Sequence, residues 1–131
     1  NLANIKKQKK ITFSLIEAGP KVDSGLIYYQ IQKTIPRNAL FNEIKKIQFN
    51  ENLKLLIKFI KFYRIKNLAP KSKIQIGKST FYKRRKPENS EININKSILS
   101  QFNLLRVSDY KNYPAYFKIY GKRYLLKIKE Y

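Results

Sequence analysis

Hydrophobic and polar residues alternate near the start of the chain, which predicts β-structure there. Ile11, Phe13 and Leu15 are separated by polar residues, and a repeat of two is the period of a strand. Residues 26–32, rich in Ile and Tyr, predict a second extended segment. Residues 1–10 are polar and basic, and they are expected to be loose or the remainder of a helix.

After the second strand the apolar spacing changes to that of a helix. Asn38 is expected to cap this helix, because its side chain can accept a hydrogen bond from the first turn. Leu40, Ile44 and Ile47 then fall on one face at steps of three and four. The same spacing continues to about Tyr63, so it predicts one long helix or two short ones that pack on a sheet.

Turn-forming residues divide the second half of the chain. Residues 66–78 contain Asn, Pro, Ser and Gly and are interpreted as a connector. Asn95 is expected to cap a second helix, whose apolar residues share one face. Residues 116–120 and 124–128 alternate around Gly121-Lys122 and predict a terminal β-hairpin.

One carboxylate stands where a catalytic acid could be held. Asp23 begins the sequence Asp-Ser-Gly between the two strand-like segments, so backbone on both sides would fix it while its side chain points above the sheet. Asp and Gly are also favoured in turns whatever their chemistry. The residues alone therefore leave open whether Asp23 is catalytic or only forms the turn.

An ordered set of segments resembles the formyltransferases that take a one-carbon unit from 10-formyltetrahydrofolate. In that family an Asp-Ser-Gly or Asp-Thr-Gly turn and a helix are followed by motifs similar to Thr80–Ser97, Gln101–Arg106 and Tyr113–Phe117. The resemblance covers about residues 11–129. Because Tyr113-Pro-Ala-Tyr-Phe leads directly into the terminal hairpin, the chain is most similar to the short bacterial members that formylate a nucleotide-linked amino sugar for surface polysaccharide.

The resemblance implies roles for individual residues. Asp23 would be the catalytic aspartate, 10-formyltetrahydrofolate the formyl donor, and a sugar nucleotide the small-molecule substrate. For Arg106 the resemblance implies a role in positioning the nucleotide. We favour a structural role, in which Arg106 ties its helix to a neighbouring loop, because an arginine near a helix end commonly binds carbonyls. The other implied positions are the turn residues Ser24 and Gly25 and the substrate-binding residues Lys83, Arg84, Arg85 and Arg106.

The chain contains no histidine, although the family's active site resembles an Asn-x-His pair beside the Asp-x-Gly aspartate. Formyl transfer needs an amine that loses a proton and donors that stabilise an oxyanion. A carboxylate alone has no imidazole to orient. We therefore expect the C-terminal part of a formyltransferase, from a truncated chain, a broken gene or a partial reading frame, and no activity from this chain alone.

The predicted fold class is α/β, in two parts. Residues 1–66 would be the remnant of a Rossmann-like formyltransferase domain, and residues 67–131 a connector with a small α+β subdomain. A remnant of a methionyl-tRNA formyltransferase is an alternative within the family. A small basic nucleic-acid-binding protein is an alternative from another class.

Composition bounds the partners. The formal net charge is +21, from 29 basic and 8 acidic residues, and such a charge ordinarily favours nucleic acid. Here the lysines are spread over the whole length beside many Ile, Asn, Tyr and Phe, the residues of AT-rich codons, so no specific nucleic-acid partner is expected. The strongest local candidate for one is residues 83–86. Without Cys or His a metal site is not expected, and without an apolar run of roughly 20 residues no membrane partner is expected and the location would be cytoplasmic.

Overall fold

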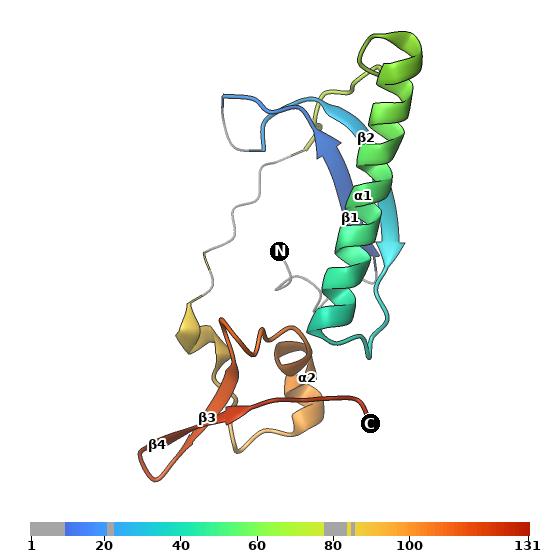
Figure 1. Cartoon of the computed structure of the whole chain (residues 1–131). Coiled ribbons are helices and arrows are strands. Elements are labelled where there is room, and N and C mark those ends of the chain that lie inside the picture. Colours follow the sequence, from blue (N-terminus) through green and yellow to red (C-terminus); the bar gives the residue numbers. More distant parts are fainter. Residues whose placement is uncertain (1–9, 21–22, 78–83, 85) are drawn as a thin grey trace. The chain divides into compact units, whose positions relative to one another are not determined.

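A computed structural model describes residues 10–20, 23–77, 84 and 86–131 of the chain. It contains two pairs of strands and two α-helices (Figure 1). In chain order the elements are β1 (Lys10–Ile16), β2 (Ile27–Thr34), α1 (Phe41–Lys66), the short 3-10 helix η2 (Pro87–Ser90), α2 (Ile98–Arg106), β3 (Ala115–Ile119) and β4 (Lys122–Leu126).

The chain forms two compact units. Unit 1 holds residues 36–44, 84 and 86–131 of the described chain, and unit 2 holds residues 10–20, 23–35 and 45–77. The predicted identities of residues 1–66 and 67–131 as a catalytic-domain remnant and a C-terminal subdomain stay predictions.

In unit 2, β1 and β2 form an antiparallel hairpin against which α1 lies (Figure 1). Phe13 of β1 and Leu55 of α1 are buried. The rings of Tyr28 and Phe59 meet edge to face with their centroids 5.1 Å apart, which joins β2 to the helix. The predicted packing of the helix on a sheet is thus present in unit 2.

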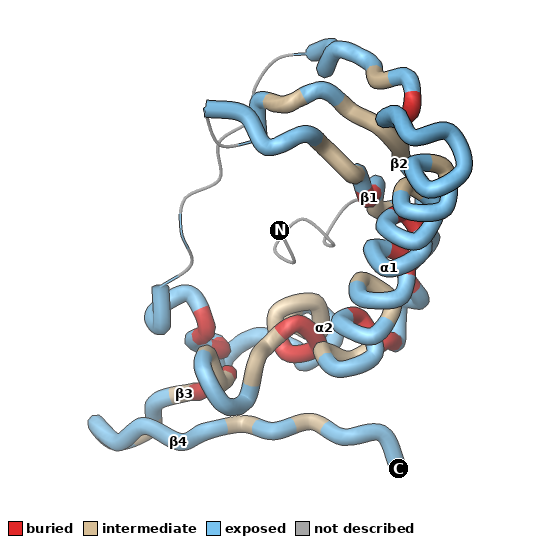
Figure 2. The backbone as a smooth tube through the Cα atoms, turned by 45° about the horizontal axis from the view of Figure 1, so that its top comes forward, coloured by how far each residue is buried: buried red, intermediate tan, exposed pale blue. Residues whose placement is uncertain are grey.

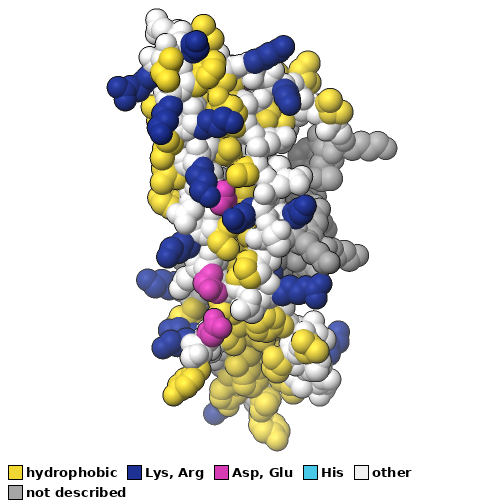
Figure 3. All heavy atoms as spheres, turned by 90° about the vertical axis from the view of Figure 1, so that its right-hand side faces the viewer, with side chains coloured by type: hydrophobic (Ala, Val, Ile, Leu, Met, Phe, Trp, Pro, Cys, Tyr) yellow, Lys and Arg dark blue, Asp and Glu magenta, His cyan; other side chains and the backbone are white. Residues whose placement is uncertain are grey.

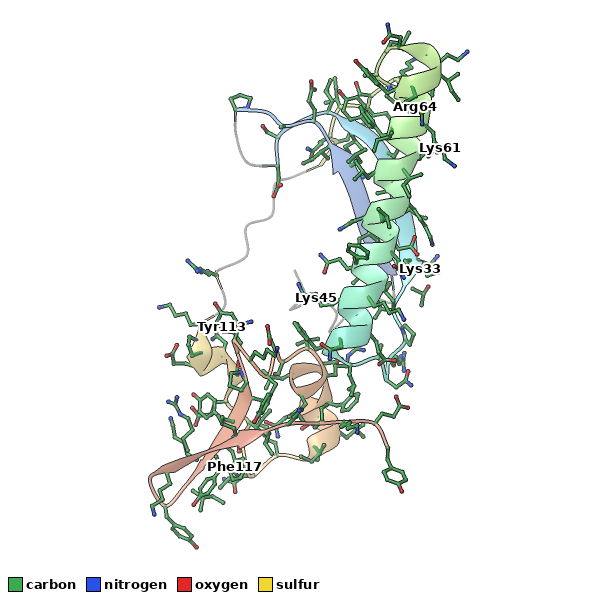
Figure 4. The ribbon with its side chains drawn as sticks, viewed as in Figure 1. Lys33, Lys45, Lys61, Arg64, Tyr113 and Phe117 are labelled. Atoms are coloured by element: carbon green, nitrogen blue, oxygen red, sulfur yellow. The ribbon has the colours of Figure 1, made fainter. Side chains whose placement is uncertain are left out.

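The opposite face of α1 carries apolar side chains that remain exposed. Phe49 is 65% exposed, and other large apolar residues of the same face are between 41% and 47% exposed. These residues are Leu53, Leu56, Ile57 and Ile60. Figure 3, which faces the helix, shows apolar side chains with Lys and Arg between them, and Figure 4 shows Lys45 near the start of α1 and Lys61 and Arg64 near its end.

The core of unit 1 is small and lies between α2 and the β3–β4 hairpin. Ile92, Leu105 and Ala115 are at most 5% exposed and form its centre. Figure 2 shows buried residues gathered in α2 and at the start of β3. Leu104, Phe117, Leu126 and Ile128 pack around this centre.

Three sequence-based boundaries are wrong by a few residues. The helix expected from Asn38 begins at Phe41, where the Glu43 carboxylate accepts the Leu40 N–H at 2.8 Å. Lys10, expected in a loose segment, belongs to β1; residues 1–9 lie outside the described residues. The terminal turn is at Tyr120-Gly121, one residue earlier than predicted.

The turn at 120–121 has φ of 48° and 74°, the backbone of a type I′ two-residue turn. Its position also shifts the last strand, which ends at Leu126 rather than at residue 128. The cap of α2 is a fourth correction. The helix begins at Ile98, so Ser97 rather than Asn95 is its cap, and the Ser97 hydroxyl accepts the Ser100 N–H at 3.3 Å. Asn95 lies in the preceding turn, where its own N–H is donated to the Asn93 side chain at 2.9 Å.

Candidate functional site

Asp23, Ser24 and Gly25, which we call the Asp23 turn, lie in the connection between β1 and β2 of unit 2. Asp23 is exposed and has a φ of 55°, a left-handed conformation that costs most residues about 1 kcal/mol or more but that Asp tolerates. A Cβ added to Gly25 would lie 1.8 Å from the Glu17 carbonyl oxygen. Only glycine fits there, because the contacted atoms are backbone atoms and cannot move aside as the end of a flexible side chain could.

A residue far along the chain supports this turn. The Gln75 side-chain amide donates to the Asp23 carbonyl at 2.8 Å and to the Gly25 carbonyl at 2.7 Å. Two residues earlier, Lys73 exchanges both backbone hydrogen bonds with Ile27, each at 2.8 Å. Sequence reasoning missed Gln75, since a glutamine in a polar connector carries no local signal of a distant partner.

Arg106 lies in unit 1, at the end of α2, and is only 3% exposed. Its Nη1 donates to the carbonyls of Pro36 at 2.8 Å and Ala39 at 3.0 Å, and its Nε donates to the Asn103 side chain at 3.0 Å. Burial lowers the pKa of the guanidinium below its ordinary value. These bonds match the structural interpretation, in which Arg106 ties its helix to a neighbouring loop.

Arg106 also lines a groove of about 690 Å³ in unit 1. Its polar lining residues come from two segments of unit 1. They include Glu43 at the start of α1, and Asp109 and Lys127, which follow α2 in the chain. The substrate-binding role of Arg106 stays a prediction. Of the three predicted binding residues of the basic loop, Arg84 is exposed, whereas Lys83 and Arg85 lie outside the described residues, and their roles stay predictions as well.

Unit 2 has a smaller groove of about 430 Å³, which is lined by Lys33 of β2 and by residues of α1, and Asp23 does not line it. Lys33, Asn50, Glu51 and Lys54 are its polar lining residues. Among the residues that the structure describes, no group of three or more acidic, His or Cys side chains could hold a metal ion. In the same part of the chain, none of the helices is both long and apolar enough to cross a bilayer.

Comparison with known proteins points to one family. No family model matches the sequence, and no curated protein matches it. The structure is similar to methionyl-tRNA formyltransferase from Clostridium thermocellum, with a TM-score of 0.63 and 28% sequence identity. The similarity covers 88% of this chain and 48% of that one, so the chain spans about half the length of the protein that it matches.

This likeness supports the formyltransferase family, and it confirms the predicted fold class, an α/β chain that matches the C-terminal part of a formyltransferase. The fit to 10-formyltetrahydrofolate is incomplete. Asp23 offers one exposed carboxylate, but the sequence has no histidine that it could orient. The catalytic role of Asp23 therefore stays a prediction, and no transfer step is assigned to the residues of this chain alone.

Proposed function

We propose that this chain is part of a formyltransferase that moves a formyl group from 10-formyltetrahydrofolate to the primary amine of a nucleotide-linked amino sugar. The observation that supports the proposal is the structural likeness to a formyltransferase over 88% of the chain, with Asp23 at the exposed end of the β1–β2 hairpin. A chain with only one of the polar groups needed for the reaction is inactive by itself.

The sugar nucleotide is proposed on the sequence that leads into β3. Tyr113-Pro-Ala-Tyr-Phe runs directly into the β3–β4 hairpin, as in the short sugar-modifying members that the sequence resembles. The solved structure that resembles this chain is named for methionyl-tRNA, whose amine is the alternative substrate. The two substrates share a primary amine, so the same aspartate chemistry serves either.

Asp23 has a defined task in this proposal. The cofactor, when bound, supplies the formyl group. The Asp23 carboxylate holds an imidazole from another part of the enzyme in the correct orientation and favours its charged form, or it accepts the amine proton through a water. A fixed turn suits either task, because proton transfer requires heavy atoms within about 3 Å of each other.

The test joins this chain behind an upstream half that carries Asn-x-His. The joined enzyme should release tetrahydrofolate when it receives 10-formyltetrahydrofolate and an amino-sugar nucleotide, and the chain alone should release none. Parallel assays with methionyl-tRNA decide between the two amines. Absence of turnover with every amine, from a joined protein that is folded by circular dichroism, would reject the proposed function.

Asp23→Asn is the variant that tests the residue. It should lower kcat of the joined enzyme by about 100-fold or more, the scale of a lost acid–base partner, with no change in the urea midpoint. Glu17→Gln is the matched control, since Glu17 is an exposed carboxylate in the same hairpin. Full activity of Asp23→Asn would leave Asp23 as a turn residue only.

A further inference from the structure

We propose that Gln75 is a positioning residue for Asp23, acting through the backbone of the Asp23 turn. This inference rests on the proposed function for its catalytic meaning. Its structural part stands on the two hydrogen bonds from one side-chain nitrogen to the carbonyls of Asp23 and Gly25, at 2.8 and 2.7 Å.

The two carbonyls belong to the Asp23–Ser24 and Gly25–Leu26 peptide units, so the amide fixes the peptide units before and after the Ser24–Gly25 peptide. Asp23 has a φ of 55°, and such a backbone persists where surrounding contacts specify it. From the other side Gly25 packs on the Glu17 backbone, which leaves no space for a Cβ. The turn therefore lies between the Glu17 backbone, which it contacts, and the Gln75 amide, which donates to it. These two contacts fix the backbone of Asp23 and so the direction of its side chain.

Gln75 is itself placed by a separate contact. Lys73 and Ile27 exchange two backbone hydrogen bonds at 2.8 Å, which joins residues 73–75 to the start of β2. These bonds involve no side chain of residue 75. A substitution at Gln75 can therefore remove the support of the turn while the connector stays attached through its backbone.

The chemistry required at position 75 is narrow. One nitrogen with two N–H groups must serve two acceptors, and the primary amide of glutamine provides this. Glutamate has the same shape but only acceptor oxygens, which would face two carbonyl oxygens. Lysine has a different shape but keeps the donors, so a series of Glu, Leu and Lys separates donor chemistry from size.

The first experiment uses the chain as it exists and measures the backbone by NMR. Gln75→Glu and Gln75→Leu should abolish the positive φ of Asp23, seen in its backbone coupling constants, whereas Gln75→Lys should keep it. Amide exchange at Ile27 and Lys73 is the internal control and should change less than threefold. A positive φ that survives in Gln75→Glu would overturn the inference.

The second experiment uses the joined enzyme described above. Gln75→Glu should lower kcat by roughly 10- to 100-fold, the effect of a displaced catalytic group, with KM within twofold of the unsubstituted enzyme. Gln75→Lys should restore most of kcat, and Lys73→Gln should match the unsubstituted enzyme, because only the backbone of Lys73 takes part. A fall in kcat that Gln75→Lys does not restore would overturn the positioning role.

The two proposals fail in different ways. Turnover by the unsubstituted joined enzyme that Gln75→Glu leaves unchanged would reject the positioning role and keep the proposed function. No turnover by the unsubstituted enzyme would reject the proposed function and, with it, the catalytic role of Gln75.

Discussion

Among the residues that the structure describes, each unit buries one charged side chain, and the two differ in how many hydrogen bonds they form. In unit 1, Arg106 is 3% exposed and donates to three oxygen acceptors. In unit 2, Glu51 is also 3% exposed; its Oε1 binds Lys54 at 2.8 Å and lies 3.9 Å from Lys33, whereas its Oε2 has no hydrogen-bond partner in the structure.

The difference teaches that burial of a charge is not in itself a measure of stabilisation. Arg106 donates to two backbone carbonyls of the loop before α1, one of which, that of Pro36, also accepts the Ala39 N–H at 3.2 Å. The loop and the helix are therefore both held by this side chain. Glu51 loses its hydration on folding, and its interactions with lysine replace only part of that lost stabilisation. The two lysine side chains that face it are 49% and 61% exposed and remain solvated. Although Arg106 and Glu51 are equally buried, replacing them by an apolar residue should therefore change the free energy of unfolding in opposite directions.

Removal of Arg106 should have the largest effect. Arg106→Met should lower the free energy of unfolding of unit 1 by about 3 kcal/mol, because the carbonyl of the buried Ala39 and the carbonyl of Pro36 lose a charged donor. Urea unfolding followed by NMR signals of each unit would measure it. Arg64→Met, at an exposed arginine, is the control, and an effect as small as the control's would show that Arg106 is not structural.

Glu51→Met should move stability in the other direction. The apolar side chain needs no partner, so unit 2 should be unchanged or more stable by about 1 kcal/mol. Glu43→Met is the matched change in the same helix and should be destabilising, because Glu43 accepts the Leu40 N–H. A loss of more than about 2 kcal/mol in Glu51→Met would end the contrast between the two buried charges.

Glu91 extends the comparison to an exposed carboxylate, one oxygen of which accepts two hydrogen bonds. Hydrogen bonds from Lys118 at 3.0 Å and from the Tyr116 hydroxyl at 2.9 Å lower the pKa of Glu91 below its ordinary value of 4.5. The unfolded chain then binds the proton more readily than the folded one. This contribution is present above pH 4.5 and is lost as the pH falls through the lowered value.

Glu91→Gln should therefore be slightly less stable than the unsubstituted chain at neutral pH. The difference should disappear in acid, because the unsubstituted chain loses the contribution of Glu91 there and the glutamine variant has none to lose. Urea midpoints of the two chains between pH 7 and pH 2 would measure it. A difference that is constant with pH would assign no role to the ionised carboxylate.

The sequence predicted those parts of the fold that depend on a repeated apolar pattern. The alternation from Ile11 to Leu15 and the helical steps from Leu40 onward correspond to β1 and α1, since burial of one face requires that spacing. Helix starts were less predictable. Asn38 does not cap α1, because the loop before the helix is held by Arg106, which lies 67 and 70 positions away from the two residues that it binds.

The candidate site divides in the same way. Asp23 could be recognised because Asp-Ser-Gly is a local sequence that resembles a family motif. Gln75 could not be, because its importance depends on a pairing across 52 residues that no local pattern encodes. The choice between Ser97 and Asn95 has a more local cause. Asn95 is an equally good cap by type, but it lies in the turn before the helix, which begins only at Ile98.

The position of Gln75 after α1 has a consequence for the order of folding. The β1–β2 hairpin can form from adjacent residues, but the Asp23 turn is complete only when α1 has reversed the path of the chain and brought residues 73–75 to it. Contacts between residues so distant in sequence must offset a large loss of chain entropy and form late. During synthesis, at least 52 residues after Asp23 must therefore be added before Gln75 can form its hydrogen bonds with the turn.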